Sequence, residues 1–290
     1  MPTTKTIQWF PGHMAKTRRL MTECLPDVDI VLEIRDARIP QSSANPEIRT
    51  LLQNKPSLLL LNKCALADAA STSKWIEHYR KEGRKCLAVD CITGEGFGHI
   101  EAAVRDVLAE KLERYRAKGM EGRRIRAMIV GIPNVGKSSL INRLCGAKKA
   151  RVEDRPGVTL SKQWASTNMG LDLLDMPGVL WPKFDDETVG ENLAVTGAIR
   201  DQIMDIEEIA CILLARLKDL FPALLCERSK LDESDIEDLQ AYEIFELVGQ
   251  KRGFLQKGGS INERRTAEIL LDEFRGGKIG RMTLELPGEV

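Results

Sequence analysis

Eight residues near the middle of the chain have the spacing of a phosphate-binding loop. The segment reads Gly131-Ile-Pro-Asn-Val-Gly136-Lys137-Ser138, follows an apolar run and opens a helical pattern. Its glycines let the backbone curl so that N–H groups face phosphate oxygens, and a helix N-terminus favours anions. We expect Lys137 to reach the β- and γ-phosphates and the Ser138 hydroxyl to ligate Mg²⁺. The other residues of the predicted nucleotide-binding set in this loop are Asn134, Val135, Gly136 and Ser139.

A second candidate motif, Asp175-Met-Pro-Gly178, ends the next apolar run. The Asp175 carboxylate suits the Mg²⁺ shell, and the Gly178 N–H suits a γ-phosphate. Alone, D-x-x-G is usually a turn, but it becomes specific at the end of a strand behind a phosphate loop. Between the two motifs, Thr159 in Arg155-Pro-Gly-Val-Thr159 is placed to close over Mg²⁺ and the γ-phosphate. A plain loop threonine is the alternative.

A third motif lies before the phosphate loop rather than after it. The apolar run 58–61 ends in Asn62-Lys63, which is how the guanine-recognition motif N-K-x-D begins. The next predicted strand runs into residues 89–94, a candidate loop over the base. In ordinary GTPases these elements follow the phosphate loop. The order here therefore predicts a circular permutation that keeps the same sheet and the same site.

The elements that must position these motifs alternate along the chain. Apolar runs predict strands at 28–34, 57–61, 86–89, 126–130 and 171–174, and helical patterns lie between them at 73–81, 100–116 and 138–144. This alternation predicts a mostly parallel sheet with helices on both faces. After about residue 185, helical spacing recurs at 206–220, 236–248 and 266–274. We predict an α/β, circularly permuted phosphate-loop domain over residues 1–185 and an all-helical domain over residues 186–290.

Composition and charge exclude some classes of protein. No apolar run in the 290 residues reaches the length of a membrane span, and the first residues lack the pattern of a secretory signal. The seven cysteines form no C-x-x-C pair, which predicts reduced thiols in a cytoplasm. Because the formal net charge is zero, a nucleic-acid surface must be local. The candidates are the basic stretches 114–126 and 251–265, with solvated helix faces as the alternative.

Taken together, the motifs resemble those of the circularly permuted GTPases of the ribosome biogenesis GTPase A family. The resemblance covers nearly the whole chain, and its segments are Trp9-Phe-Pro-Gly-His13-Met, Asp36-Ala-Arg-Ile-Pro40, Asn45-Pro46, the phosphate loop, Arg155-Pro-Gly-Val-Thr159, Asp175-Met-Pro-Gly-Val-Leu-Trp-Pro-Lys-Phe184, Leu193-Ala-Val-Thr-Gly-Ala198 and Lys251-Arg-Gly253. It implies a cytoplasmic GTPase that binds GTP and GDP with Mg²⁺ and acts in maturation of the large ribosomal subunit. It also implies rRNA and ribosomal proteins as partners, with the helical domain binding RNA. We expect a monomer.

Hydrolysis needs a group that orients the attacking water. Many GTPases place a glutamine just after D-x-x-G, but here that position is Val179, followed by Leu180. The resemblance implies His13 as the candidate, and a structural histidine in the Pro-Gly-His turn is the alternative. It also implies that Asn134 helps to hold K⁺. A site without the glutamine is expected to be slow alone and faster on the ribosomal particle.

One position departs from the family pattern, because N-K-x-D reads Asn62-Lys63-Cys64-Ala65. Ala65 cannot accept the two hydrogen bonds that the aspartate takes from guanine, and leaving such donors unpaired costs about 1–3 kcal/mol. Asp68 lies nearby in sequence and is an alternative acceptor. Two other functions therefore stay open: a GTPase switch for a protein partner without RNA, and a nucleotide-sensing scaffold with little hydrolysis.

Overall fold

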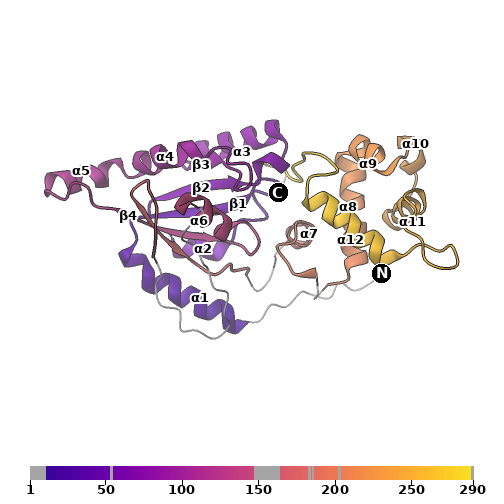
Figure 1. The fold of residues 1–290 in the computed structure, drawn as a ribbon, viewed down its shortest axis with the longest axis horizontal. Coiled ribbons are helices and arrows are strands. Elements are labelled where there is room, and N and C mark those ends of the chain that lie inside the picture. Colours follow the sequence, from indigo (N-terminus) through magenta and orange to yellow (C-terminus); the bar gives the residue numbers. More distant parts are fainter. Residues whose placement is uncertain are drawn as a thin grey trace.

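The computed structural model describes residues 11–52, 55–146, 164–181, 184, 186–201 and 204–288, with side chains from residue 15 on. Within these residues a sheet has the strand order β3-β2-β1-β4-β6-β5 (Figure 1). Its strands are β1 Ile30–Asp36, β2 Ser57–Asn62, β3 Lys85–Ala88, β4 Ile125–Gly131, β5 Trp164–Ser166 and β6 Leu171–Asp175. All neighbours are parallel except β5, which runs antiparallel to β6. The predicted mostly parallel sheet is confirmed; the short edge strand β5 was not predicted.

The ends of four strands bring the predicted motifs to one edge of the sheet. In the register of the sheet, Asp36 of β1 lies beside Asn62 of β2, and Ile34 lies beside Gly131 of β4. Asp175 of β6 lies beside Ile129 of β4. Ligands of open parallel sheets bind at this carboxyl edge. The strand order thus places the base motif and the phosphate loop side by side although their order along the chain is permuted.

Helices cover both faces of the sheet. The helices α4 (Ile100–Val107) and α6 (Lys137–Cys145) pack against the face that carries Leu32, Leu58 and Ile129. The opposite face is covered by α1 (Pro11–Cys24), α2 (Pro46–Leu51) and α3 (Ala69–Lys81). Strands buried on both faces explain why their sequences are continuous apolar runs rather than alternating ones.

The segment predicted as one helix at 100–116 forms two helices. α4 ends at Val107, the buried Leu108 interrupts the helix, and α5 (Ala109–Ala117) continues beyond it. Every residue of α5 is at least partly exposed, and the helix extends away from the sheet (Figure 1). In α5 the contact with the core is limited to the partly buried Leu112, so little apolar surface holds α5 in line with α4.

The rest of the chain forms a group of helices at the other end of the molecule (Figure 1). They are α7 Glu187–Val195, α8 Ile206–Leu220, α9 Pro222–Ser229, α10 Glu233–Ile236, α11 Ala241–Lys251 and α12 Glu263–Arg275. α8 lies at their centre, and its apolar side packs on α7, α9, α11 and α12. The helix predicted from residue 236 begins instead at Ala241, where Gln240 and Glu243 form a capping box. No helix in the described part of the chain is both long and apolar enough to span a bilayer.

After α12 the chain returns to the sheet, and we call residues 278–288 the returning segment (Figure 1). The Leu284 N–H donates to the Arg38 carbonyl (2.8 Å), just beyond β1. The Trp75 indole N–H, on α3, donates to the Glu285 carbonyl (2.9 Å), and the Glu285 carboxylate accepts from the Ser42 N–H (3.0 Å). The last described residues therefore pack on the first part of the chain, and Glu285 also accepts from Asn192 of α7 (3.4 Å).

A buried acid ties three of the C-terminal helices together. Glu273 of α12 accepts hydrogen bonds from Arg252 (2.6 Å), which directly follows α11, and from Arg228 of α9. Burial acts to raise the pKa of Glu273, but the hydrogen bonds and charges of the two arginines outweigh it and lower this pKa to about 2. The carboxylate therefore stabilises the folded state above the ordinary glutamate pKa of 4.5.

Replacing Glu273 with glutamine is expected to destabilise the helical part in a pH-dependent manner. A pKa shift of this size corresponds to roughly 3 kcal/mol, which screening around the exposed Arg228 reduces to about 2 kcal/mol at pH 7. Because the folded-state pKa is lowered, this contribution is lost as pH falls from 4.5 toward 2. Chemical denaturation of Glu273→Gln and wild type at a series of pH values measures it. Glu268→Gln, on the same helix with an exposed partner, is the control, and an equal loss in both variants would contradict the expectation.

Candidate functional site

The phosphate-binding motif forms the predicted loop between a strand and a helix. β4 ends at Gly131, and α6 begins at Lys137. Asn134 and Gly136 have positive φ angles of 55° and 105°, which turn successive backbone groups to one side of the loop. The Val135 side chain is buried in the core beneath. Val135 thus holds the loop against the core, while Asn134, Ser138 and Ser139 are exposed on its outer side.

Lys137 lies with its ammonium group inside this loop. The Nζ atom donates to the carbonyls of Ile132 (2.7 Å) and Gly131 (3.3 Å), and the side chain is buried. Burial lowers the pKa of Lys137 to about 8, and the nearby charge of Asp175 opposes this shift. A phosphate in the loop would offer this ammonium charged oxygens in place of two neutral carbonyls, which favours anion binding.

The second motif is in direct contact with the phosphate loop. A Cβ atom on Gly178 would lie 2.7 Å from Lys137 Nζ and 2.8 Å from the Pro133 backbone, so only glycine fits at this position. The Val179 N–H donates to the Gly131 carbonyl (3.4 Å). Asp175 ends β6 at the same edge of the sheet. The structure therefore brings Asp175, Gly178, Lys137 and Ser138 to one place, as the sequence predicted.

The donors at this place suit a hard cation. Asp175 supplies carboxylate oxygens, and Ser138 supplies an exposed hydroxyl in the first turn of α6. Mg²⁺ prefers a few such oxygen ligands together with water and phosphate oxygens. The third predicted ligand, Thr159, lies outside the described residues. His13 falls within α1, and its side chain is also outside the described part.

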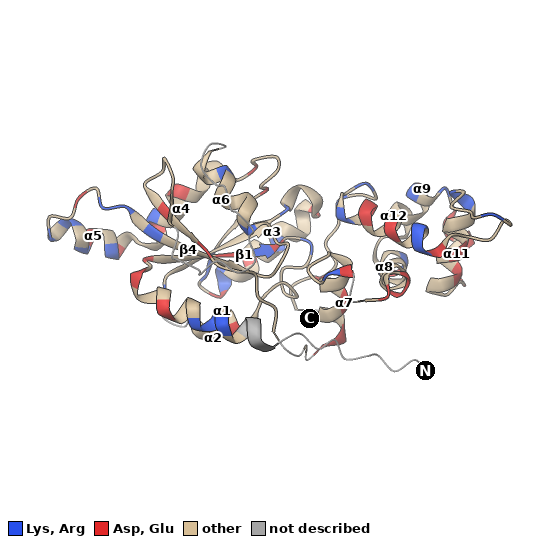
Figure 2. Ribbon diagram, turned by 60° about the horizontal axis from the view of Figure 1, so that its bottom comes forward, with Lys and Arg blue, Asp and Glu red and all other residues tan. Residues whose placement is uncertain are grey.

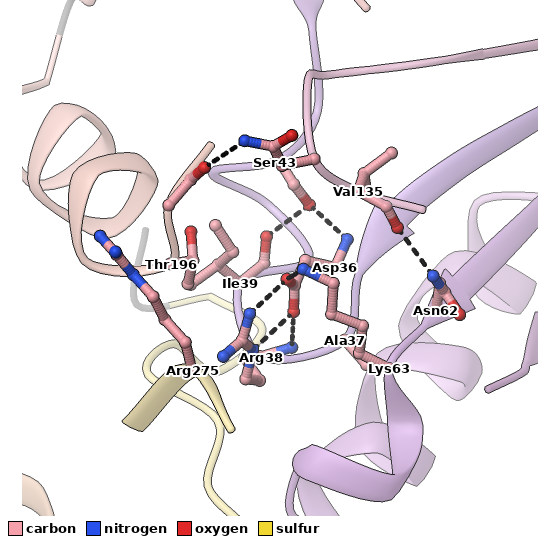
Figure 3. Close-up of polar contacts among 12 residues, drawn as sticks. Asp36, Ala37, Arg38, Ile39, Ser43, Asn62, Lys63, Val135, Thr196 and Arg275 are labelled. Atoms are coloured by element: carbon pink, nitrogen blue, oxygen red, sulfur yellow. Dashed lines mark hydrogen bonds and ion pairs between the residues drawn. The ribbon is translucent and has the colours of Figure 1, made fainter. Parts of the chain in front are cut away.

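Asn62 connects the base half of the site to the phosphate half. Its Nδ2 donates to the Val135 carbonyl of the phosphate loop (2.7 Å), as Figure 3 shows. Its Oδ1 accepts from the Cys91 N–H (3.1 Å). One buried side chain thus joins the end of β2, the phosphate loop and the segment after β3. This arrangement requires both halves of the amide, which explains why an asparagine stands here.

Lys63 is held by an acid that the sequence analysis did not select as a site residue. Its Nζ lies 3.0 Å from Asp36 Oδ2, and the same carboxylate pairs with the Arg38 guanidinium (2.8 Å) (Figure 3). Burial alone would raise the pKa of Asp36, but Arg38 and Lys63 hold it well below its usual range. Arg38 also packs over the Phe274 ring of α12. An aspartate that ends an apolar strand was the available signal for this role.

We call residues 63–68 the base loop. Position 65, where the motif N-K-x-D has its aspartate, is an alanine. Ala65 lies in the short 3-10 turn Cys64–Leu66, where it is partly exposed. The alternative acceptor Asp68 caps α3, because its Oδ2 accepts from the Ser71 N–H (2.6 Å). That hydrogen bond lowers the pKa of Asp68. The Asp68 carboxylate therefore already has a structural task at the N-terminus of α3.

The helical part also borders the site. Asn134 Nδ2 donates to the Gly197 carbonyl (2.8 Å), just after α7. Beside this contact lies a cavity of about 520 Å³, lined by Lys63, Asn134, Thr196, Gly197, Ile199, Arg200, Asp201 and Arg275. Arg275 at the end of α12 is fixed there by Asp201 (2.7 Å) and by the Val195 carbonyl (3.0 Å). That α7 and α12 border the phosphate loop was not predicted from the sequence.

Exchanging Gly136 for alanine tests the contact between the two halves. The new Cβ would lie 2.3 Å from Asn62 Nδ2, so the hydrogen bond from Asn62 to Val135 must break. We expect GDP affinity to fall about tenfold, the effect of one lost buried hydrogen bond. Gly146→Ala is the matched control, because Gly146 has a φ of 71° but nothing within 4 Å of a Cβ. Equal losses in both variants would attribute the effect to backbone strain.

Comparison with known proteins agrees with this geometry. A family model described as "50S ribosome-binding GTPase" matches residues 126–245. Ribosome biogenesis GTPase A of Bacillus pumilus is 48% identical over 97% of this chain and 99% of its own, and that of Priestia megaterium is 50% identical over 98% of each. The chain belongs to the ribosome biogenesis GTPase A family. The family member from Thermotoga maritima is 30% identical over 98% of this chain and 96% of its own.

Solved structures of a family member have the same fold. The GDP-bound structure of T. maritima YlqF superposes with a TM-score of 0.65 at 26% identity, covering 93% of this chain and all of that one. The GNP-bound structure gives 0.66 at 27% identity, covering 95% and 100%. Membership in the ribosome biogenesis GTPase A family makes this chain a GTPase that binds guanine nucleotides. The order of its motifs, with Asn62 ahead of Lys137, is the permuted order that the sequence predicted.

Proposed function

We propose that this protein binds and hydrolyses GTP in the cytoplasm during maturation of the large ribosomal subunit, slowly alone and faster on the subunit precursor. The observation that carries the nucleotide part is the pair of hydrogen bonds through which Asn62, at the end of β2, joins the phosphate loop at Val135 to the segment after β3 at Cys91. The ribosomal part is supported by relatives named ribosome biogenesis GTPase A that match the whole chain.

In this proposal each motif residue has a separate task. Lys137 neutralises the β- and γ-phosphates, and the Gly178 N–H contacts the γ-phosphate. Ser138, Asp175 and Thr159 would hold Mg²⁺, which screens the charge of the phosphates when bound. The buried apolar side chains of Val179 and Leu180 support a water-orienting group elsewhere, because neither can contact a water by hydrogen bonding. We assign that task to His13 of α1.

Asn134 is proposed to contribute to a K⁺ site. Its Nδ2 is used by Gly197, which leaves Oδ1 as the atom that would face a cation. A monovalent cation beside the phosphates would offset charge that builds up in hydrolysis. Single-turnover GTP hydrolysis in KCl and in NaCl tests this assignment. We expect faster hydrolysis in KCl, and equal rates in wild type would remove the K⁺ assignment.

The surface around α5 is the proposed rRNA contact of the GTPase domain, residues 1–185. α5 and the loop after it carry many basic side chains on an element that extends from the molecule (Figure 2). Lys111 and Arg123 pair with Asp29, whereas Arg114 and Lys118 are exposed. Basic side chains of this kind bind phosphates in a salt-dependent manner. The basic stretch 251–265 is the proposed contact of the helical domain, residues 186–290.

One experiment tests the ribosomal part of the proposal. The protein is sedimented with large subunits in GDP or in a non-hydrolysable GTP analogue, and single-turnover hydrolysis is measured with and without subunits. We expect binding that is stronger with the GTP analogue and weaker at high salt, together with faster hydrolysis on the particle. Fast hydrolysis by the protein alone, or binding that is the same in both nucleotides, would contradict the proposal.

A second function has a specific observation in its favour. Val179 and Leu180 are buried, and Ala65 presents no carboxylate to a base. These features favour a nucleotide-sensing scaffold that hydrolyses little. In that case large subunits would bind in a nucleotide-dependent manner but would leave the single-turnover rate unchanged.

A further inference from the structure

The returning segment, residues 278–288, contacts the loop that would hold the guanine base. That loop spans Lys63 to Asp68 and contains the position where Ala65 replaces aspartate. The Met282 N–H donates to the Leu66 carbonyl (3.0 Å), and the Asp68 N–H donates to the Thr283 hydroxyl (3.2 Å). The backbone of the base loop is thus hydrogen-bonded to residues more than two hundred positions later in the chain.

Arg281 makes the most specific of these contacts. Its Nε donates to the Ala67 carbonyl (2.9 Å), and its Nη2 donates to the Cys64 carbonyl (3.0 Å). The two carbonyls lie on either side of Ala65. The planar guanidinium fork therefore spans the turn and fixes the distance between its two ends, which a single-point donor cannot do.

The base loop has few other fixed points. Its own backbone closes by hydrogen bonds from Leu66 N to Lys63 O (2.9 Å) and from Ala67 N to Cys64 O (3.2 Å). Toward the rest of the sheet, Cys64 N donates to Val89 O (3.2 Å), and Lys63 Nζ pairs with Asp36 (3.0 Å). An aspartate at position 65 would fix guanine through its side chain, whereas Ala65 leaves recognition to the placement of the backbone and of Asn62 and Lys63. Small displacements of this turn should therefore matter more here than in a loop with the aspartate.

We propose that Arg281, through the carbonyls of Cys64 and Ala67, is a positioning residue for the base-binding loop. This inference rests on the proposed nucleotide site. The same segment follows α12 directly, so the helical domain is connected to the base loop by a short stretch of backbone. Nucleotide affinity is then set partly by residues outside the GTPase motifs.

The test compares Arg281→Ala with a variant that loosens the same segment elsewhere. Trp75→Phe removes the indole hydrogen bond to the Glu285 carbonyl, which does not involve the base loop. We expect Arg281→Ala to weaken GDP binding about tenfold, with a faster GDP dissociation rate, and to change ADP binding less than about twofold. Trp75→Phe is expected to lower the melting temperature but to leave GDP affinity within about twofold of wild type.

A conservative variant keeps the test informative if Arg281→Ala folds poorly. Arg281→Lys retains the charge but offers one donor group, so about a threefold loss of GDP affinity is expected. Loss of GDP and ADP binding in equal proportion, or GDP affinity unchanged in both Arg281 variants, would overturn the inference. Failure of the wild-type protein to bind GDP would instead overturn the proposed function.

Discussion

Replacing Lys137 with alanine is expected to weaken GTP and GDP binding by about 100-fold and to abolish measurable hydrolysis on the ribosomal particle. The Lys137 ammonium is the one predicted to contact two phosphates, and each charge-assisted hydrogen bond contributes roughly 1.5–3 kcal/mol. Within the described residues its hydrogen-bond partners are the carbonyls of Ile132 and Gly131. Burial lowers the pKa of Lys137 to about 8, so the protein interior disfavours this charge when no anion is bound, and its removal should not destabilise the fold strongly.

Equilibrium titration with a fluorescent GDP analogue measures the Lys137 effect, and a thermal melt shows that the variant is folded. Lys85→Ala is the control, because Lys85 is exposed and pairs with Asp106 at the surface. The control should bind GDP as the wild type does. If Lys137→Ala kept its affinity, the loop from Gly131 to Ser138 would not be the phosphate site.

Replacing Ala65 with aspartate is expected to sharpen the selection of guanine by about 10- to 100-fold. The new carboxylate would accept hydrogen bonds from N1–H and from the 2-amino group of guanine. Inosine triphosphate lacks the 2-amino group, and xanthosine triphosphate carries an oxygen in its place. The wild type should therefore distinguish GTP poorly from inosine triphosphate, while Ala65→Asp should favour GTP and reject xanthosine triphosphate.

Competition titrations with GTP, ATP and the two analogues measure this change. Ala70→Asp, in the first turn of α3, adds the same charge at an exposed position and serves as the control. Its base preference should match that of the wild type. Strict GTP preference in the wild type would show that another group, such as a backbone carbonyl of the base loop, replaces the missing aspartate. Equal affinities for GTP and ATP in the wild type would mean that Asn62 and Lys63 do not select guanine.

Much of the fold and of the phosphate half of the site could be predicted from local sequence. Strands buried on both faces are continuous apolar runs, and a parallel sheet places all their carboxyl ends at one edge. Once Asn62, Gly131 and Asp175 were assigned to strand ends, their meeting followed from topology. The bounds of α8, Ile206–Leu220, are those predicted, because its apolar spacing is regular.

The contacts between distant segments could not be predicted in this way. Asn134 to Gly197 and Arg281 to Cys64 each depend on how the C-terminal helices and the returning segment approach the sheet. Charged and polar residues carry no periodic signal that names their partners, so hydrophobic patterns alone leave such pairs open. The break between α4 and α5 was missed for a related reason, since helix propensity continues beyond Leu108 while the contact of α5 with the core is limited to the partly buried Leu112.

The returning segment also sets the order in which the protein can be completed during synthesis. β1 and β2 emerge from the translating ribosome well before Glu285, the partner of Ser42 and Trp75, which follows these two residues by 243 and 210 positions. Contacts of such long sequence separation fold late, because the entropy of closing the loop must be overcome first. A nascent chain would thus secure its base loop only after the returning segment has been made. If Arg281 positions that loop as we propose, full nucleotide affinity follows the docking of the returning segment.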